Sequence, residues 1–127
     1  MISLENYIVN EITNTLATEY PSAKVGSEYT RTSAVFPYVQ VVEIDTSVFQ
    51  RATTLSRIEN MATIVIEIQF FSNKKSGKKA ECKELAEIVD EIMENNGFMR
   101  MMLNQVQNYE DATIYRMVGR WQKIQPK

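Results

Sequence analysis

The sequence predicts a single α+β domain, 1–127, in which two helices pack on one face of a mostly antiparallel or mixed sheet. Apolar residues recur at helical spacing in 3–19 and 79–95, and every second residue of 61–71 is apolar in the manner of a strand. At 127 residues and 44% hydrophobic, the chain can bury one core but divides poorly into two. The expected element order is α-β-β-β-α-β-β.

The first helix, 3–19, is amphipathic. Ser3 is the expected N-cap, Glu5 lies in the first turn, and Pro21 follows the end of the helix. Its apolar stripe is formed by Leu4, Ile8, Val9, Ile12 and Leu16. This stripe is expected to pack on the sheet.

Three strands are expected between the helices. The first, within 23–30, has the weakest signal, and the second, 37–45, is rich in β-branched residues. The third, 61–71, has the clearest alternation. Its core-facing set is Ala62, Ile64, Ile66, Ile68 and Phe70, and Met61, Thr63, Val65, Glu67 and Gln69 point the other way.

The segment 46–59 contains no Gly or Pro to fix a tight turn, so an extended hairpin arm or a long loop is expected. Phe49, Arg51 and Arg57 give it a mixture of apolar and charged side chains that suits a partner surface. An ordinary loop is the alternative.

The second helix, 79–95, has an apolar face and an acidic face. Leu85, Ile88, Val89, Ile92 and Met93 form the first, and Glu84, Glu87, Glu91 and Glu94 form the second. The sequence at 95–97, Asn-Asn-Gly, is expected to end the helix, because Asn and Gly accept the left-handed conformation. Two more strands, 98–106 and 112–124, are expected to form a hairpin around 108–111.

The last strand carries apolar residues on both sides. Tyr115, Met117 and Trp121 share one side, and Ile114, Val118 and Ile124 share the other. Two helices cover only one sheet face, so burial of the second side against another subunit is expected.

Composition excludes several kinds of chemistry. The chain has no histidine, which removes Ser-His-Asp and Cys-His nucleophiles and every histidine-containing metal site. Its four glycines are too widely spaced for a phosphate loop, and a net charge of −2 does not favour nucleic acid. No cofactor is expected, and neither a secretory signal nor an apolar segment of membrane-spanning length is seen. A soluble, non-enzymatic protein that folds inside a cell is therefore expected.

Two candidate sites remain. Cys82 lies near Lys78, Lys79 and a helix start, which can activate a thiol, but a small, partly buried helix residue is the preferred interpretation. Asp45 and Glu67 on neighbouring strands are similar to the two acids of magnesium-dependent nucleases. Gln69 stands where such enzymes have lysine, so a solvated sheet face is preferred over a nuclease.

Charges on the second helix suggest self-association. Lys74, Lys75, Lys78 and Lys79 lie around its start, and glutamates, Glu87 and Glu91 among them, follow along its side. This order of charges is the reverse of the one that the helix dipole favours. A soluble turn and a solvated helix surface explain these charges without a partner. Alternatively, the basic end of one subunit meets the acidic side of the next in a head-to-tail ring.

The second half, residues 60–122, resembles the tail-terminator and tail-completion proteins of long-tailed bacteriophages and prophages, particularly prophages of Gram-positive bacteria. The resemblance is carried by the strand end 69–73 (QFFSN), a lysine- and glycine-containing turn, an acidic helix, 96–98 (NGF), and a strand opening at 111–116 (DATIYR). The first half matches only in general layout.

This resemblance implies a sheet flanked by helices and a ring of six subunits that caps the tail tube in the virion. Its implied partners are the tail tube protein and a head-completion or connector protein, with assembly in the host cytoplasm. Phe49, Arg51 and Arg57 are the expected tube-binding residues. Tyr115, Met117 and Trp121, with the charged residues above, are the expected subunit interface. A neck adaptor or stopper protein is the alternative, and the resemblance implies no catalytic residue.

Overall fold

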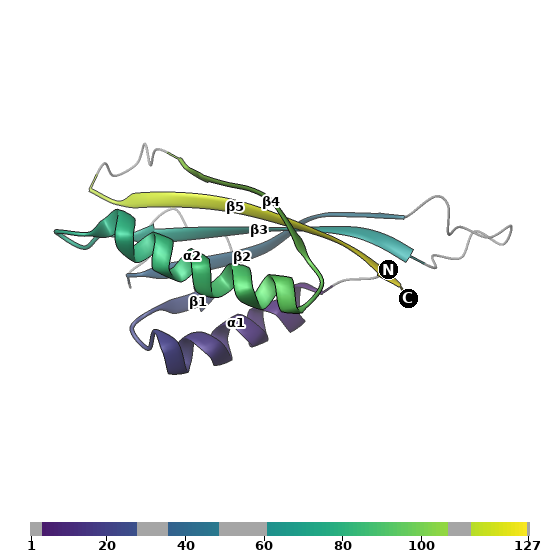
Figure 1. Cartoon of the computed structure of the whole chain (residues 1–127), viewed down its shortest axis with the longest axis horizontal. Coiled ribbons are helices and arrows are strands. Elements are labelled where there is room, and N and C mark those ends of the chain that lie inside the picture. Colours follow the sequence, from purple (N-terminus) through teal and green to yellow (C-terminus); the bar gives the residue numbers. More distant parts are fainter. Residues whose placement is uncertain (1–3, 28–35, 49–60, 107–112, 127) are drawn as a thin grey trace, which may run out of the picture.

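The alternating segment 61–71 lies at the centre of a five-stranded sheet. The computed structural model describes residues 4–27, 36–48, 61–106 and 113–126. In these residues the elements are α1 (Glu5–Glu19), β1 (Lys24–Gly26), β2 (Tyr38–Val48), β3 (Met61–Ser72), α2 (Lys78–Asn95), β4 (Met99–Gln105) and β5 (Tyr115–Pro126). The strand order is β1-β2-β3-β5-β4 (Figure 1). The predicted α+β class and element order are confirmed.

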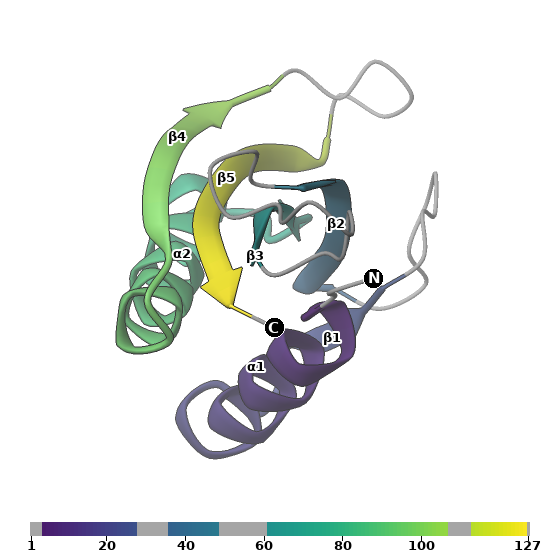
Figure 2. The same ribbon diagram turned by 90° about the vertical axis from the view of Figure 1, so that its right-hand side faces the viewer.

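The sheet is mixed. β1 pairs parallel with β2, whereas β2–β3, β3–β5 and β5–β4 are antiparallel. Both helices lie on the same side of it, α1 beneath β1 and β2 and α2 across β3, β5 and β4 (Figure 2). The second sheet face carries no helix in the described part of the chain.

The core lies between this sheet and the helices. The predicted inward residues of β3, from Ile64 to Phe70, are all 0% exposed, and they meet Val39 and Val41 of β2. The helices contribute Ile8, Ile12, Leu16, Cys82, Leu85, Ala86, Val89, Ile92 and Met93. Burying each large aliphatic side chain contributes roughly 1.5–3 kcal/mol. The predicted stripes are confirmed, with Leu4, Val9 and Ile88 only partly buried at their margins.

The end of α2 is fixed by its sequence. Gly97 has a φ of 84°, its N–H donates to the Glu94 carbonyl at 3.0 Å, and the Phe98 N–H donates to the Met93 carbonyl at 2.9 Å. These two bonds form a Schellman motif, as the run of Asn and Gly predicts. Lys123 of β5 donates to the Asn96 carbonyl at 2.7 Å and brings a positive charge to this helix end.

Other boundaries differ from the prediction. The N-cap of α1 is Leu4, so the assignment of Ser3 was wrong. β2 runs three residues further than predicted, because its pairing with β3 continues through Val48, after an irregularity between Glu43 and Asp45. Residues 46–48 of the predicted loop are therefore strand, and 49–60 lie outside the described residues. No described helix is both long and apolar enough to cross a membrane.

Gly119 of β5 is required by the packing of Trp121. A Cβ at position 119 would lie 2.5 Å from Cη2 of the Trp121 indole and 3.1 Å from Cδ1 of Leu103. Trp121 is 0% exposed, and its indole N–H donates to Asp90 of α2 at 3.0 Å, so the ring cannot shift freely. The indole thus packs over Gly119, and its hydrogen bond to Asp90 joins β5 to α2.

We predict that Gly119→Ala lowers the free energy of unfolding by about 1–3 kcal/mol, the usual range for overpacking a core. Urea denaturation would measure the loss. Trp121→Phe removes the two indole atoms nearest to the new methyl group, so the alanine should cost less in that background. An equal cost in both backgrounds would contradict this origin.

Candidate functional site

The sheet face opposite the helices carries the polar residues of the central strands. Glu67 and Gln69 of β3 point to this face, because they alternate with the core residues Ile66 and Ile68. An apolar cluster of Tyr38, Phe71 and Ile114, with Phe36 packed against it, lies at one end. The face is therefore part apolar and part charged.

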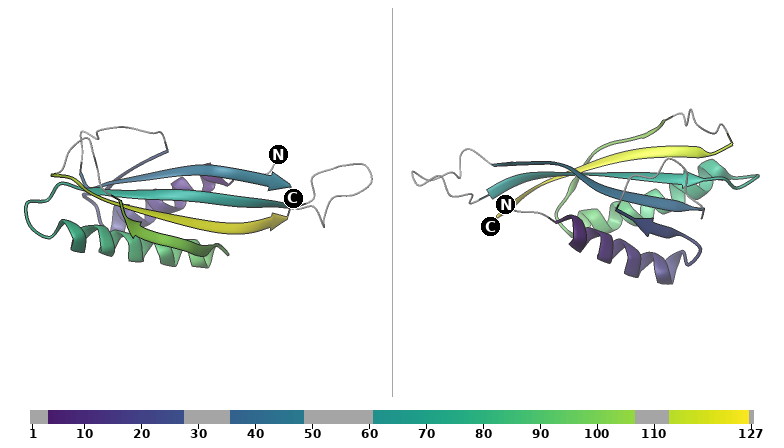
Figure 3. Two further views of the ribbon diagram at one scale, coloured as in Figure 1. Left: turned by 90° about the horizontal axis from the view of Figure 1, so that it is seen from above. Right: turned by 180° about the vertical axis from the view of Figure 1, so that it is seen from behind.

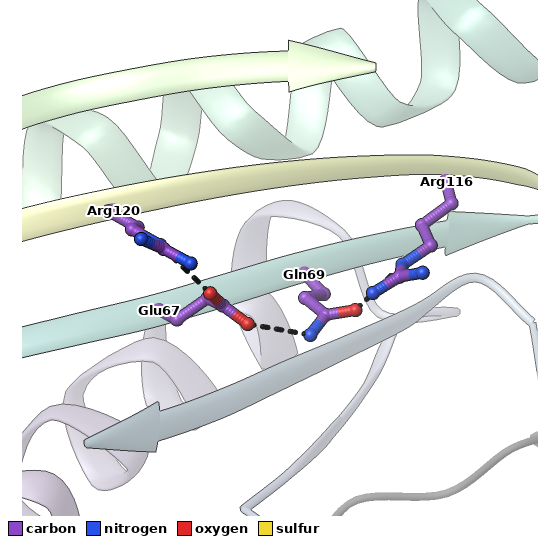
Figure 4. A network of polar contacts seen from close by, with 4 residues as sticks. All are labelled: Glu67, Gln69, Arg116 and Arg120. Atoms are coloured by element: carbon purple, nitrogen blue, oxygen red, sulfur yellow. Dashed lines mark hydrogen bonds and ion pairs between the residues drawn. The ribbon is translucent and has the colours of Figure 1, made fainter. Parts of the chain in front are cut away.

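A chain of four polar side chains crosses this face from β3 to β5 (Figure 4). Arg116 Nε donates to Gln69 Oε1 at 2.8 Å, and Gln69 Nε2 donates to Glu67 Oε1 at 2.9 Å. Arg120 Nε donates to Glu67 Oε2 at 3.0 Å. Glu67 and Arg120 are direct partners in the strand register, whereas Arg116 reaches Gln69 from its position opposite Phe71. The pleat thus places all four side chains on the same sheet face, each within hydrogen-bonding distance of a neighbour.

This network orients two guanidinium groups on the sheet. Arg120 is 48% exposed at its side chain and Glu67 17%, so their ion pair contributes only about 0.2–1 kcal/mol. The Arg116 guanidinium also lies 6.0 Å from the centre of the Phe71 ring. A guanidinium has five N–H donors, so each arginine can bind a carboxylate or carbonyl of a partner in addition to its present bond.

The nuclease hypothesis gains no support from this geometry. Both carboxylate oxygens of Glu67 accept hydrogen bonds, and the β2 residue opposite it is Val42, not Asp45. Asp45 stands opposite Val65, beyond the irregularity in β2. Within the described residues, no three or more Cys, Asp or Glu side chains are grouped to hold a metal.

The charged residues predicted at the subunit interface lie on accessible surface. Lys74, Lys75 and Lys79 are exposed and Lys78 is half-buried around the start of α2. Glu87 and Glu91 are exposed along its outer side, as are Glu84 and Glu94, so the solvated acidic surface is confirmed. A role of these residues in subunit contacts stays a prediction.

The aromatic and apolar part of the predicted interface needs correction. Met117 and Trp121 are 5% and 0% exposed and pack in the core of their own chain, so neither is available to a neighbour, and Tyr115 is half-buried beside them. On the second side Val118 is also buried, and Ile124 is 42% exposed. Both sides of β5 are thus largely covered within one chain. Phe49, Arg51 and Arg57 lie outside the described residues.

Exposed apolar side chains are found instead at the sheet edge formed by β4. Met99 is 65% exposed and Met101 is 53% exposed. Sequence reasoning assigned these methionines only to a hairpin strand. The signal was present, because 99–103 reads Met-Arg-Met-Met-Leu without the alternation that a half-buried strand shows.

Glu81 is a second position that sequence reasoning missed. Its carboxylate accepts hydrogen bonds from the Tyr20 hydroxyl at 2.7 Å and the Ser72 hydroxyl at 2.6 Å. Ser72 is 0% exposed, and the three residues join the end of α1, the end of β3 and the first turn of α2. The hydrogen bond to Glu81, followed by burial, raises the pKa of Tyr20 to about 12. An acid in the first turn also suits the helix dipole.

Cys82 is a structural residue, as preferred from the sequence. It is 0% exposed, and its thiol lies 3.8 Å from the carbonyl oxygen of Phe70. Burial, and then the charge of Glu81, raises the pKa of the thiol to about 12. Nearby lysines therefore do not activate it.

A small pocket of about 210 Å³ lies between the start of α1 and the end of α2. It is lined by Leu4, Tyr7, Ile8, Asn96, Phe98 and Lys123. Its volume is below the roughly 300–1,000 Å³ typical of small-molecule sites. A second hollow, of about 340 Å³, lies beside the start of β4 and is lined by Asp90, Glu94, Phe98, Met99 and Arg100. The open sheet face and the β4 edge, which this hollow adjoins, are the stronger candidates for a functional surface.

Comparison with known proteins adds no assignment: no protein-family model matches the chain, and no curated protein matches its sequence.

We predict that Glu81→Ala lowers the free energy of unfolding by about 1–3 kcal/mol, since it leaves the buried Ser72 hydroxyl without its acceptor. Glu84→Ala, on the exposed side of the same helix, should stay within about 0.5 kcal/mol of the parent. Urea denaturation of both variants provides the comparison.

Comparison of the parent with Glu81→Ala also tests how the free energy of unfolding depends on pH. Because the folded-state pKa of Tyr20 is raised from 10.0, its contribution is present below about pH 10 and is lost as the pH rises towards 12. The stability difference between parent and Glu81→Ala should narrow in that window. A stability difference that stays constant from pH 10 to about pH 12 would show that the Tyr20–Glu81 hydrogen bond does not contribute to it.

We predict that Cys82 does not react with a thiol-specific reagent in the folded protein at neutral pH, and reacts fully after unfolding in urea. A buried thiol with a raised pKa supplies neither access nor thiolate. Absorbance of the released chromophore would measure both reactions. Rapid labelling of the folded chain would show that Cys82 is accessible and would contradict its structural role.

Proposed function

We propose that the chain is a non-enzymatic assembly subunit of a long-tailed bacteriophage or prophage. In this proposal it forms a homo-oligomeric ring, of six subunits as the resemblance implies, at the head-proximal end of the tail tube. The ring ends tube polymerisation and presents a surface for head attachment. Its remaining partners are the tail tube protein and a head-completion or connector protein.

The observation that carries the proposal is the exposure of large apolar side chains at an edge of the sheet. Met99 and Met101 on β4 remain in water in the isolated chain. Exposed apolar residues gathered on one strand are typical of a surface that a protein partner covers. The mixed sheet with helices on one face also agrees with the fold that the resemblance implies.

The network on the open sheet face supports the same class of function. Arg116 and Arg120 are held in place by neutral and acidic neighbours, and guanidinium groups fixed in this way suit recognition of partner carboxylates. Together with the exposed lysines and glutamates of α2, they give the subunit several polar surfaces and one apolar edge. A ring subunit that meets two different proteins needs such distinct surfaces. Tube binding through Phe49, Arg51 and Arg57 stays a prediction.

A neck adaptor or stopper protein is the second candidate, because the same resemblance extends to those proteins. The two roles differ in what limits tail length. A terminator stops growth of the tube, whereas an adaptor or stopper acts on the head side and leaves the tube unchanged.

We predict that removing this protein from the encoding phage or prophage yields tails of uncontrolled length that fail to join heads. Electron microscopy of induced lysates would measure tail lengths, and the parent gene supplied in trans should restore them. Tails of normal length beside unjoined heads would favour the adaptor or stopper. Labelled protein at the distal baseplate would reject both positions.

A further inference from the structure

The surface of α2 carries two separate blocks of charge. The lysine block lies around the start of the helix and consists of Lys74, Lys75, Lys78 and Lys79. The glutamate block follows along its exposed outer side and consists of Glu84, Glu87, Glu91 and Glu94. Among the residues that the structure describes, no member of either block has an ion-pair partner. Both blocks are therefore uncompensated in the isolated chain.

This separation of charge disfavours the isolated helix. Glu87 and Glu91 are exposed and four residues apart, as are Lys79 and Lys83, and like charges at this spacing repel one another on a helix surface. The last turn of α2 contains no basic residue, although the helix dipole favours one there. Residues that oppose local preferences in this way are expected where they serve a function.

The hollow beside the start of β4 extends the glutamate block. Glu94 lines it together with Phe98 and Met99, and Met99 is 65% exposed. Asp90 and Arg100, which complete its lining, form an ion pair of 3.2 Å, so Glu94 supplies the uncompensated charge. The hollow thus places a carboxylate beside an apolar side chain. This combination suits a lysine, whose aliphatic stem packs on apolar groups while its ammonium group binds a carboxylate.

A lysine of the lysine block cannot fill the hollow of its own chain. The turn 73–77, which contains Lys74 and Lys75, and the start of β4 lie at opposite ends of α2 (Figure 3). At about 1.5 Å per residue, the helix from 78 to 94 spans about 24 Å. This is more than a lysine and a glutamate side chain can bridge together. The lysine that fits the hollow must therefore come from another molecule.

We propose that the lysine block of one copy of the chain docks onto the glutamate block of a second copy, with a lysine of the 73–77 turn in the hollow beside Met99. This inference rests on the proposed ring and names the contact between its subunits. The two blocks are opposite in charge and contain equal numbers of charged residues. Because they lie at opposite ends of α2, the contact joins two different surfaces and repeats from copy to copy. Such a heterologous contact closes into a ring when the rotation allows it.

An antiparallel pair of α2 helices would also bring opposite blocks together, but it would stop at a dimer. Its two-fold axis would pass midway between the 73–77 turn and Glu94, next to Glu84. The Glu84 carboxylates of the two copies would then lie close together and repel each other. The head-to-tail contact avoids this repulsion and is the arrangement that we infer.

Charge reversal in the full chain tests whether the blocks meet. One double variant joins Lys74→Glu with Lys75→Glu, and the other joins Glu91→Lys with Glu94→Lys. We expect each to raise the dissociation constant of self-association roughly tenfold or more, because like charges then face each other. Sedimentation at low salt would measure this change. An equal mixture of the two variants should restore the oligomer of the parent, because each reversed block then meets an opposite one.

Two controls separate loss of contact from loss of fold. Lys24→Glu, at an exposed position of β1 outside both blocks, should leave self-association unchanged. The variant with Glu91→Lys and Glu94→Lys should be at least as stable in urea as the parent, because basic residues suit the end of a helix. A reversal that weakens association only by unfolding the chain, or a mixture that does not restore it, would overturn the inference.

Cysteine cross-linking tests the head-to-tail geometry without changing either block. Ser76→Cys and Asn95→Cys, exposed neighbours of the two blocks, are combined and treated with a short bismaleimide, while the buried Cys82 stays unreactive. We expect a ladder of covalent multimers. Covalent dimers alone would show the antiparallel pair and reject the head-to-tail contact. A ladder of equal yield from Ser76→Cys with Asn14→Cys, an exposed position of α1, would indicate random collision and also reject it.

The same samples separate this inference from the proposed function. Closed oligomers of the parent that both charge reversals leave intact would reject the contact and leave the ring. Monomers of the parent at every concentration would reject the contact as one that forms in solution, and tail lengths in the phage would still test the terminator role. Association that both reversals weaken, with a ladder that ends at the oligomer mass, supports the contact and the ring together.

Discussion

The alternation along β3 is the constraint on which the rest of the molecule depends. Its even-numbered residues from Ile64 to Phe70 are fully buried beneath the two helices, and its odd-numbered neighbours Glu67 and Gln69 carry the polar network on the opposite face. A register shift of one residue would exchange the two sets and bury an ion-paired glutamate. β2 and β5 pair along β3 on either side, so their faces follow from it.

Polar contacts fix how the helices lie on this sheet. At one end of α2, Glu81 binds hydroxyl groups from α1 and β3, and at the other end Lys123 of β5 binds the last carbonyl of the cap. Between them, Asp90 accepts the indole N–H of Trp121. Burial is non-directional, whereas these bonds require particular positions. They therefore set the placement of α2 along β5, and through it the position of the Trp121 indole over Gly119.

Periodicity predicted the elements because burial depends on which side of a helix or strand a residue occupies. The stripes of α1 and α2, the inward set of β3 and the stop at Gly97 were all predicted. It could not predict how far β2 runs, because Val48 is held in the strand by its pairing with Ala62 rather than by local sequence. Nor could it find Glu81, whose partners lie nine and 61 residues away in the chain.

The predicted interface failed for an instructive physical reason. Apolar residues on both sides of β5 suggested that one side needed a partner, but Trp121 is buried under α2 and Val118 is buried on the opposite face. These apolar side chains are therefore already buried within the chain and cannot drive its association with a partner. The two most exposed large apolar side chains among the described residues, Met99 and Met101, lie on β4, where strand order leaves an edge. Strand order depends on long-range pairing.

An exposed strand edge can bind a partner without leaving a binding motif in the sequence. Strand addition uses backbone N–H and C=O groups, which every residue except proline supplies, and side chains add only selectivity. Such a surface requires an unpaired strand and a few exposed apolar residues rather than a fixed set of functional groups. A chain without histidine and without a described metal cluster can therefore still have a specific partner.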